Sequence, residues 1–84
     1  MASMDELIRS MEANLADVRF ADLCRVCDHV FGQPRQARGS HRIYRTPWPG
    51  NPRVNIQNER GKAKAYQVRQ VLEAVHKLRK EERP

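Results

Sequence analysis

The chain has 84 residues, with 16 lysines and arginines against 10 aspartates and glutamates, and a formal net charge of +6. A chain of this length buries only about 60–65% of the surface that it exposes when unfolded, so it forms one small domain, residues 1–84, and a second core is excluded. The excess of positive charge predicts a polyanionic partner, with nucleic acid ahead of a membrane surface.

Neither a membrane span nor a secretory signal is recognisable in the sequence. Uninterrupted apolar runs fall well short of the ~20 residues of a span, and the segment 1–6 lacks the basic region and apolar core of a signal. We therefore expect a cytoplasmic protein with no membrane partner. Two cysteines are too few for a disulfide framework, and a reducing compartment would keep them as thiols.

Two amphipathic helices are predicted at the start of the chain. Ser3 followed by Glu6 fits a capping box, and apolar residues then recur at helical spacing, so we expect a helix over residues 4–15. A second apolar stripe, followed by Gly32 in a C-cap position, predicts a helix over residues 20–31.

Three strands and a last helix are expected to follow. Proline cannot donate to a central ladder, so the segment 34–37 allows at most a short edge strand. Residues 41–46 favour a strand, and the alternation in residues 53–57 predicts its hairpin partner. With a helix over residues 65–79, the order α-α-β-β-β-α predicts an α+β fold, in which helices cover one face of an antiparallel three-stranded sheet.

Cys24 and Cys27, followed by His41 after thirteen intervening residues, have the spacing of the first three ligands of a zinc finger. The fourth ligand is missing, because no histidine follows three to five residues beyond His41. Both cysteines also continue the apolar stripe of the second predicted helix. We interpret them as small buried hydrophobes, and we expect neither a metal nor a cofactor.

Two aromatic residues leave alternatives open. Trp48, between two prolines, could stack on a base, or it could pack against the domain or a protein partner, which is more usual for a ring held in a hairpin loop. Ile43 and Tyr44 fall on opposite faces of their strand, so only one of them can face the core.

The turn Gly39-Ser40-His41 is the candidate catalytic element. Glycine permits backbone conformations closed to other residues, so a Gly-Ser turn can expose the next side chain at a strand end and leave backbone N–H groups free for an anion. Histidine has an unperturbed pKa of about 6.5, so it can donate or accept a proton at cellular pH. The alternative is a solvated bystander histidine.

Cationic residues gather at two places near the expected sheet. Arg60, Lys62 and Lys64 precede the last helix, where unpaired N–H groups and the positive end of the helix dipole favour phosphate. This clustering favours a nucleic-acid surface over an ordinary solvated face. Five further arginines lie on or beside the expected strands: Arg35, Arg38, Arg42, Arg45 and Arg53.

Several short motifs between Phe20 and Leu78 are typical of one known family. They are Asp22-Leu23, Gly39-Ser40-His41, Ile43-Tyr44-Arg45, the proline-bearing hairpin, Val54-Asn55-Ile56 and Val68-Arg69-Gln70-Val71-Leu72. In these motifs the chain resembles the HicA toxins of bacterial type II toxin–antitoxin systems. The resemblance implies a core over residues 18–80 that is like a double-stranded-RNA-binding domain, α-β-β-β-α, with the helix over 4–15 as an N-terminal addition.

The resemblance implies a toxin that acts as a metal-independent endoribonuclease on mRNA, with His41 as its catalytic histidine. It also implies a HicB-type antitoxin that covers His41 and the basic face, with operator DNA as a further candidate partner through the antitoxin complex. We expect the residues that bind substrate to divide into two groups. The scissile phosphate would be held by Arg42 or Arg45 with the amides of Gly39 and Ser40, and the flanking backbone by Lys62 and Lys64.

Two other functions remain open at the level of the sequence. One is a non-catalytic module that binds double-stranded RNA by reading A-form shape through the helix entrance and the hairpin. The other is an adaptor that uses the additional N-terminal helix for assembly.

Overall fold

The computed structural model describes residues 3–50 and 52–82, which form three helices and four strands. Helix α2 has the predicted bounds, whereas α1 ends two residues before, and α3 three residues after, the predicted positions. The elements are α1 (Met4–Ala13), α2 (Phe20–Phe31), β1 (Gln36–Arg38), β2 (His41–Arg45), β3 (Arg53–Glu59), β4 (Lys62–Ala63) and α3 (Ala65–Glu82).

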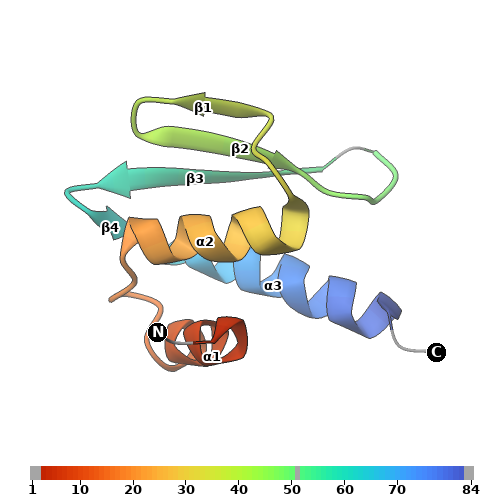
Figure 1. The fold of residues 1–84 in the computed structure, drawn as a ribbon, viewed down its shortest axis with the longest axis horizontal. Helices are drawn as coiled ribbons and strands as arrows, with labels where there is room; N and C mark the ends of the chain where they lie inside the picture. Colours follow the sequence, from red (N-terminus) through yellow and green to blue (C-terminus); the bar gives the residue numbers. More distant parts are fainter. Residues whose placement is uncertain (1–2, 51, 83–84) are drawn as a thin grey trace.

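The strands form one antiparallel sheet in the order β1-β2-β3-β4 (Figure 1). The expectation of three strands is wrong, because β4 adds a fourth. This strand is created by the turn Arg60-Gly61, in which both residues have positive φ, 53° and 86°. Such a two-residue turn matches the twist of a hairpin and pairs Glu59 with Lys62. Two residues are too few to give a periodic signal in the sequence.

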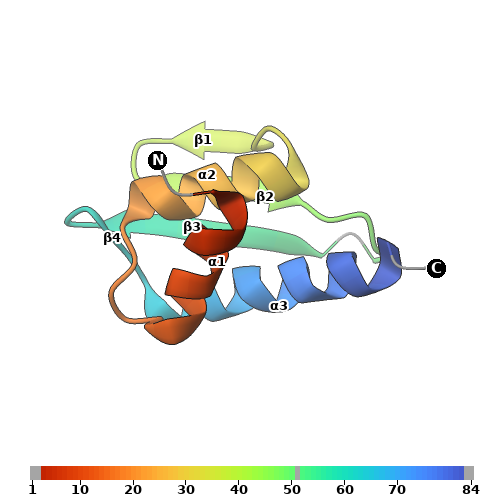
Figure 2. The same cartoon turned by 60° about the horizontal axis from the view of Figure 1, so that its bottom comes forward.

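The helices form two layers on one side of the sheet. Helix α2 packs against β2, β3 and β4, and α3 packs against β3. Helix α1 lies on the far side of α2 and α3, away from the sheet (Figures 1 and 2). The expectation that helices cover one face of the sheet is thus confirmed, and the other face is left open. None of the helices that the structure describes is long and apolar enough to cross a bilayer.

The core lies between the sheet and the helices. Tyr44, Val54 and Ile56 face it from the sheet, each at most 5% exposed, so the open question between Ile43 and Tyr44 is settled in favour of Tyr44. Cys24 and Cys27 are buried free thiols, and burial raises the pKa of both. Their interpretation as buried hydrophobes is confirmed.

Helix α1 is an integral part of the core. Its start is capped as predicted, because the Glu6 amide donates to Ser3 Oγ at 3.2 Å. Two side-chain contacts join it to α3: Asp5 forms an ion pair with Arg79 at 2.6 Å, and Glu12 Oε2 lies 2.7 Å from His76 Nε2. The apolar side chains of α1 are buried against the rest of the chain, so they do not form a free surface for a partner: Leu7, Ile8 and Met11.

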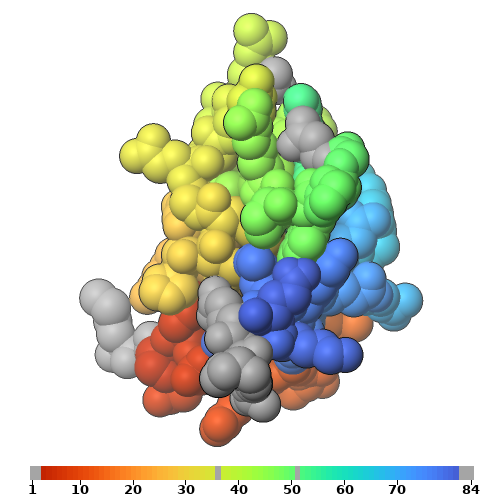
Figure 3. Space-filling model, turned by 90° about the vertical axis from the view of Figure 1, so that its right-hand side faces the viewer, coloured from red at the N-terminus to blue at the C-terminus, as the bar shows by residue number. Residues whose placement is uncertain are grey.

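The loop between β2 and β3 rests on the C-terminal part of α3 (Figure 3). Trp48 Nε1 donates to the Glu81 carboxylate at 2.6 Å, and Lys77 Nζ lies 4.3 Å from the centre of the Trp48 ring. A cation over an indole face is attracted by the ring quadrupole. Of the two interpretations of Trp48, packing against the domain is therefore the one observed.

Tyr44 ties the sheet to α2. Its hydroxyl donates to Asp28 Oδ1 at 2.6 Å, and its ring lies 6.2 Å from that of Phe31, centre to centre. Burial, and then the hydrogen bond to Asp28, raise the pKa of Tyr44 well above its ordinary value. The neutral phenol is therefore the form that the fold stabilises.

This raised pKa predicts alkaline unfolding. An unfolded tyrosine loses its proton near pH 10, so the contribution of Tyr44 to stability is complete below about pH 10 and is lost as the pH rises further. In a Tyr66→Phe variant, whose only tyrosine is Tyr44, we expect tyrosinate absorbance to develop only together with unfolding measured by circular dichroism. Tyrosinate formation in the folded protein near pH 10 would contradict this account.

Candidate nucleic-acid interface

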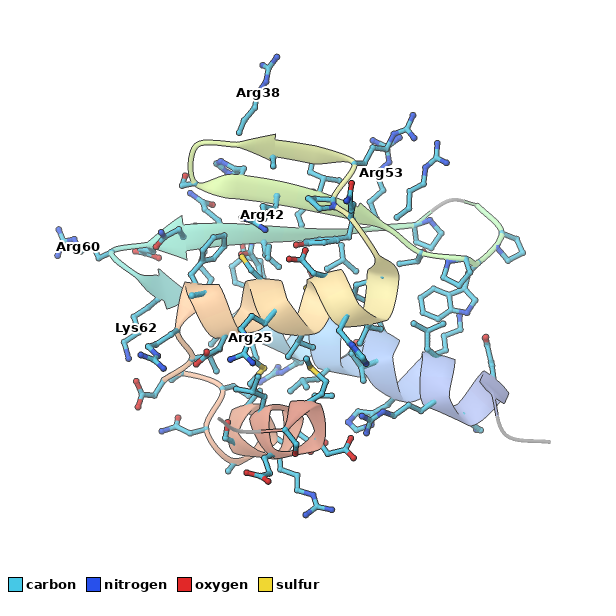
Figure 4. All side chains as sticks on the ribbon, in the orientation of Figure 1. Arg25, Arg38, Arg42, Arg53, Arg60 and Lys62 are labelled. Carbon is cyan, nitrogen blue, oxygen red and sulfur yellow. The ribbon has the colours of Figure 1, made fainter. Side chains whose placement is uncertain are left out.

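The register of the sheet decides which side chains share the open face. His41 pairs with Arg38 of β1 and with Gln57 of β3, and these residues alternate with the buried Tyr44 and Ile56. Figure 4 shows Arg38 and Arg53 projecting away from the helices. The residues that the register assigns to this face are Arg38, His41, Ile43, Arg45, Arg53, Asn55, Gln57, Glu59 and Lys62.

His41 lies exposed at the first position of β2. It follows the turn Gly39-Ser40, in which Gly39 has a φ of 52°, a value that L-residues other than glycine adopt at a cost. The Ser40 carbonyl accepts a hydrogen bond from the Asn58 amide at 2.8 Å, which holds the turn against β3. The imidazole is thus presented to solvent from a fixed turn, which is one of the two orientations that the sequence left open.

Arg45 and Arg53 stand directly opposite each other on the same face, and both are exposed. Like charges at directly opposed positions of an antiparallel pair destabilise it. Neither arginine has an ion-pair partner among the described side chains, although other cations of the chain do. The paired cations include Arg19 with Asp22, Arg42 with Asp28, Lys62 with Asp17 and Arg79 with Asp5. The open face therefore combines cations that the fold leaves uncompensated.

Arg42 does not join His41. It is directed to the helix side of the sheet, where its NH1 lies 3.7 Å from Asp28 Oδ2 on α2 (Figure 4). The cation next to His41 on the open face is Arg38, which the sequence reasoning did not assign to the site. The signal that could have found it is the length of the turn, because a two-residue loop pairs the residue before it with the residue after it.

Lys62 and Lys64 occupy different surroundings at the start of α3. Lys62 Nζ contacts Asp17 Oδ1, and this contact, by hydrogen bond and by charge, lowers the pKa of Asp17. Lys64 is half-buried, and its carbonyl accepts the amides of Gln67 and Val68 at 2.9 and 3.0 Å, which makes it the N-cap residue. The first turn of α3 contains no acidic residue, so the positive end of the helix dipole is reinforced by Lys64 and not offset.

The two tight turns lie at one end of the sheet, because Ser40 and Asn58 are joined across β2 and β3. The second turn is held by Asn58 Oδ1, which accepts the Gly61 amide at 2.6 Å. Arg60 occupies a position with positive φ and extends into solvent (Figure 4). A bulky side chain there is strained. Gly39, Ser40, His41 and Lys62 thus share one end of the molecule.

The candidate site is not a pocket. One hollow of the surface lies between α2 and α3, and another, between β3 and α3, includes Arg53 and Asn55 in its lining, but His41 lines neither. Small-molecule sites are concave and enclose their ligand, so a flat face suits a polymer better. In the part of the chain that the structure describes, no group of three His, Cys, Asp or Glu residues is arranged to hold a metal ion.

Comparison with known proteins gives no relative. No family model, no curated protein and no solved structure matches the chain.

The strain at Arg60 leads to a prediction that separates stability from binding. Asn-Gly is the preferred pair for this turn, so Arg60→Asn should raise the free energy of unfolding by about 1 kcal/mol. The same change removes a cation and should weaken binding to a polyanion. Urea denaturation and fluorescence anisotropy measure the two effects. A variant that loses stability would contradict the strain assigned to Arg60.

Proposed function

We propose that the protein is an endoribonuclease that cleaves mRNA with His41 as a catalytic group. The observation that carries the proposal is the position of His41: it is exposed on the helix-free face of the sheet, directly opposite Arg38, beside a Gly-Ser turn. The resemblance of the sequence to the HicA toxins supports the same activity. In that setting the enzyme is the toxin of a toxin–antitoxin pair.

Cleavage of RNA requires only a few catalytic groups, which a small protein can supply. RNA supplies its own nucleophile, the 2′-hydroxyl, so the enzyme has to align this group with the phosphate, move protons and offset charge. His41 acts either as general base on the 2′-hydroxyl or as general acid on the leaving 5′-oxygen, which is worth roughly 10²–10⁴ in rate. Arg38, together with the amides of Gly39 and Ser40, is placed to hold the scissile phosphate.

The substrate that fits this face is a single strand with little sequence preference. Arg45 and Arg53 lie four residues along their strands from the His41–Gln57 pair, a separation of about 13 Å at the rise of a β-strand. They are placed to hold a phosphate further along the same RNA strand. None of the residues assigned to the open face is Phe, Tyr or Trp, so this face lacks a platform of large aromatic rings on which successive bases could stack.

An inhibitory partner is part of the proposal. A HicB-type antitoxin that covers His41 would place acidic groups opposite the uncompensated arginines of the open face, because complementary charge sets specificity and the rate of association. Operator DNA would then be a partner of the complex, reached through the antitoxin.

The catalytic role of His41 can be tested with two matched histidine variants. We expect purified His41→Ala to lose RNA cleavage by a factor of roughly 10²–10⁴, while it folds and binds RNA as the parent does. His29→Ala removes an exposed histidine from α2 and should cleave normally. Cleavage of a long RNA is read on a gel, and circular dichroism checks the fold.

Two results would count against the proposal. If His41→Ala cleaves as well as the parent, the catalytic assignment is wrong. If the parent binds duplex RNA with steep salt dependence and never cleaves, the chain is the non-catalytic binding module.

The role of Arg45 and Arg53 is tested by removing both charges. The double variant Arg45→Gln/Arg53→Gln should bind a single-stranded 2′-O-methyl oligonucleotide more weakly, with a salt slope lower by about 0.7 for each lost phosphate contact. It should also be more stable by about 0.2–1 kcal/mol, because the repulsion across the strands is gone. Arg9→Gln/Lys80→Gln removes the same charge from α1 and α3 and should leave the slope unchanged. If the two double variants lowered the salt slope equally, Arg45 and Arg53 would not form a specific phosphate-binding site.

A further inference from the structure

We infer that Glu59 is the second proton-transfer group of the site, the general base that works with His41 as general acid. This inference rests on the ribonuclease function proposed above and goes beyond it, because it names the partner that completes the reaction.

The register brings Glu59 near His41. Gln57 stands directly opposite His41, and Glu59 follows two residues later on the same face of β3. Such diagonal neighbours lie about 7–8 Å apart, within reach of long side chains. Both side chains are exposed. A phosphodiester placed between them would meet a carboxylate on one side and an imidazole on the other, with Arg38 beside the imidazole.

The backbone around Glu59 is fixed on both sides. The preceding amide, that of Asn58, donates to Ser40, and the Asn58 side chain accepts the Gly61 amide across the following turn. These two hydrogen bonds join the turn that carries His41 to the turn that follows Glu59. The two side chains are therefore mounted on one rigid unit, which is what positioning for proton transfer requires.

The Glu59 carboxylate is not used to balance a cation. Lys62 is directly opposite it in the ladder, but Lys62 Nζ contacts Asp17 instead. No ion pair or hydrogen bond engages the Glu59 carboxylate among the side chains that the structure describes. The Glu59 carboxylate is thus available to interact with a substrate.

Electrostatics argues against a role in binding alone. A carboxylate at the end of a cationic face repels a phosphate backbone and weakens the affinity for RNA. A carboxylate can accept a proton, whereas a protonated imidazole can donate one. This division gives one face both the base and the acid that cleavage of RNA needs.

The step balances without any further reactant. The Glu59 carboxylate takes the proton of the 2′-hydroxyl, and the 2′-oxygen forms a bond to phosphorus. The bond from phosphorus to the 5′-oxygen breaks, its electron pair stays on that oxygen, and the His41 imidazolium gives it a proton. The products are a 2′,3′-cyclic phosphate and a 5′-hydroxyl. Proton exchange with water restores both side chains.

The test separates catalysis from binding in Glu59→Gln, with Glu73→Gln on α3 as the matched control. Because the change removes a repulsive charge, Glu59→Gln should bind a 2′-O-methyl oligonucleotide more tightly than the parent. It should nevertheless cleave RNA roughly 10²–10⁴ times more slowly, and its pH–rate profile should lose the acidic limb. Glu73→Gln should keep the parent's rate and profile, and Glu59→Asp should recover part of the rate.

A substrate with an aryl leaving group assigns the two roles, because such a group departs without a proton. On a nucleoside 3′-aryl phosphate, His41→Ala should recover most of its rate and Glu59→Gln should not. The inference is wrong if Glu59→Gln cleaves RNA as the parent does. It is also wrong if, on the aryl substrate, Glu59→Gln recovers its rate and His41→Ala does not. Either result leaves the ribonuclease function intact when His41→Ala is inactive on RNA, whereas a parent that cleaves nothing overturns both proposals.

Discussion

The pairing register of the β1–β2 hairpin is the constraint on which the arrangement of the site depends. A one-residue slip of a strand moves every side chain to the opposite face, so a shifted hairpin would bury His41 and expose Tyr44. Two features prevent the slip. The two-residue turn Gly39-Ser40 fixes Arg38 opposite His41, and Tyr44 is held from the core side by its hydrogen bond to Asp28. The same pairing register therefore both buries Tyr44 and exposes His41.

The second organising feature is the unequal covering of the sheet. All three helices lie on one side, with α1 behind α2 and α3, so the hydrophobic core is closed without using the other face of the sheet. Antiparallel sheets commonly have one packed and one solvated face. Here the solvated face carries Arg38, His41, Arg45 and Arg53, whereas Arg42, on the covered face, forms an ion pair with a side chain of α2. The fold thereby separates the part that provides stability from the part that can bind an anion.

The sequence predicts the elements of this fold better than it predicts the neighbours of each side chain. Helical periodicity and caps locate α2 at its observed bounds, and alternation correctly directs Val54 and Ile56 to the core. Strand β4 is not predicted from the sequence, because its two residues are too few to show an alternating pattern. The turn before it also has Arg60 at a position where Asn or Gly is usual. Trp48 forms a hydrogen bond with Glu81, which is 33 residues away in the sequence, and no local sequence pattern predicts such a contact.

For the candidate site, the residue types of the two turns were predictable, but the faces were not. Arg42 and Arg45 are three residues apart on one strand and must point to opposite faces, and only the observed register shows that Arg42 is the one that faces α2. Arg38 is recognisable in the sequence as one of several arginines near the strands. Its position beside His41 depends on the length of the turn between them. Glu59 carried no signal of its own, since its proximity to His41 depends on how β3 pairs with β2.

The uncompensated charge of the open face bears on the choice among functions. Repulsion between Arg45 and Arg53 costs stability in the free protein, and a chain this small has little stability to spare. Such an arrangement persists where an anionic ligand offsets it, because a ligand that binds only the folded state stabilises that state. An adaptor that worked through α1 would not need these arginines but would need a free apolar face on α1, and the structure buries that face. A duplex-binding module would use the start of α3, but it has no need of a histidine mounted beside Arg38 and Glu59. A nuclease accounts for both sets of residues.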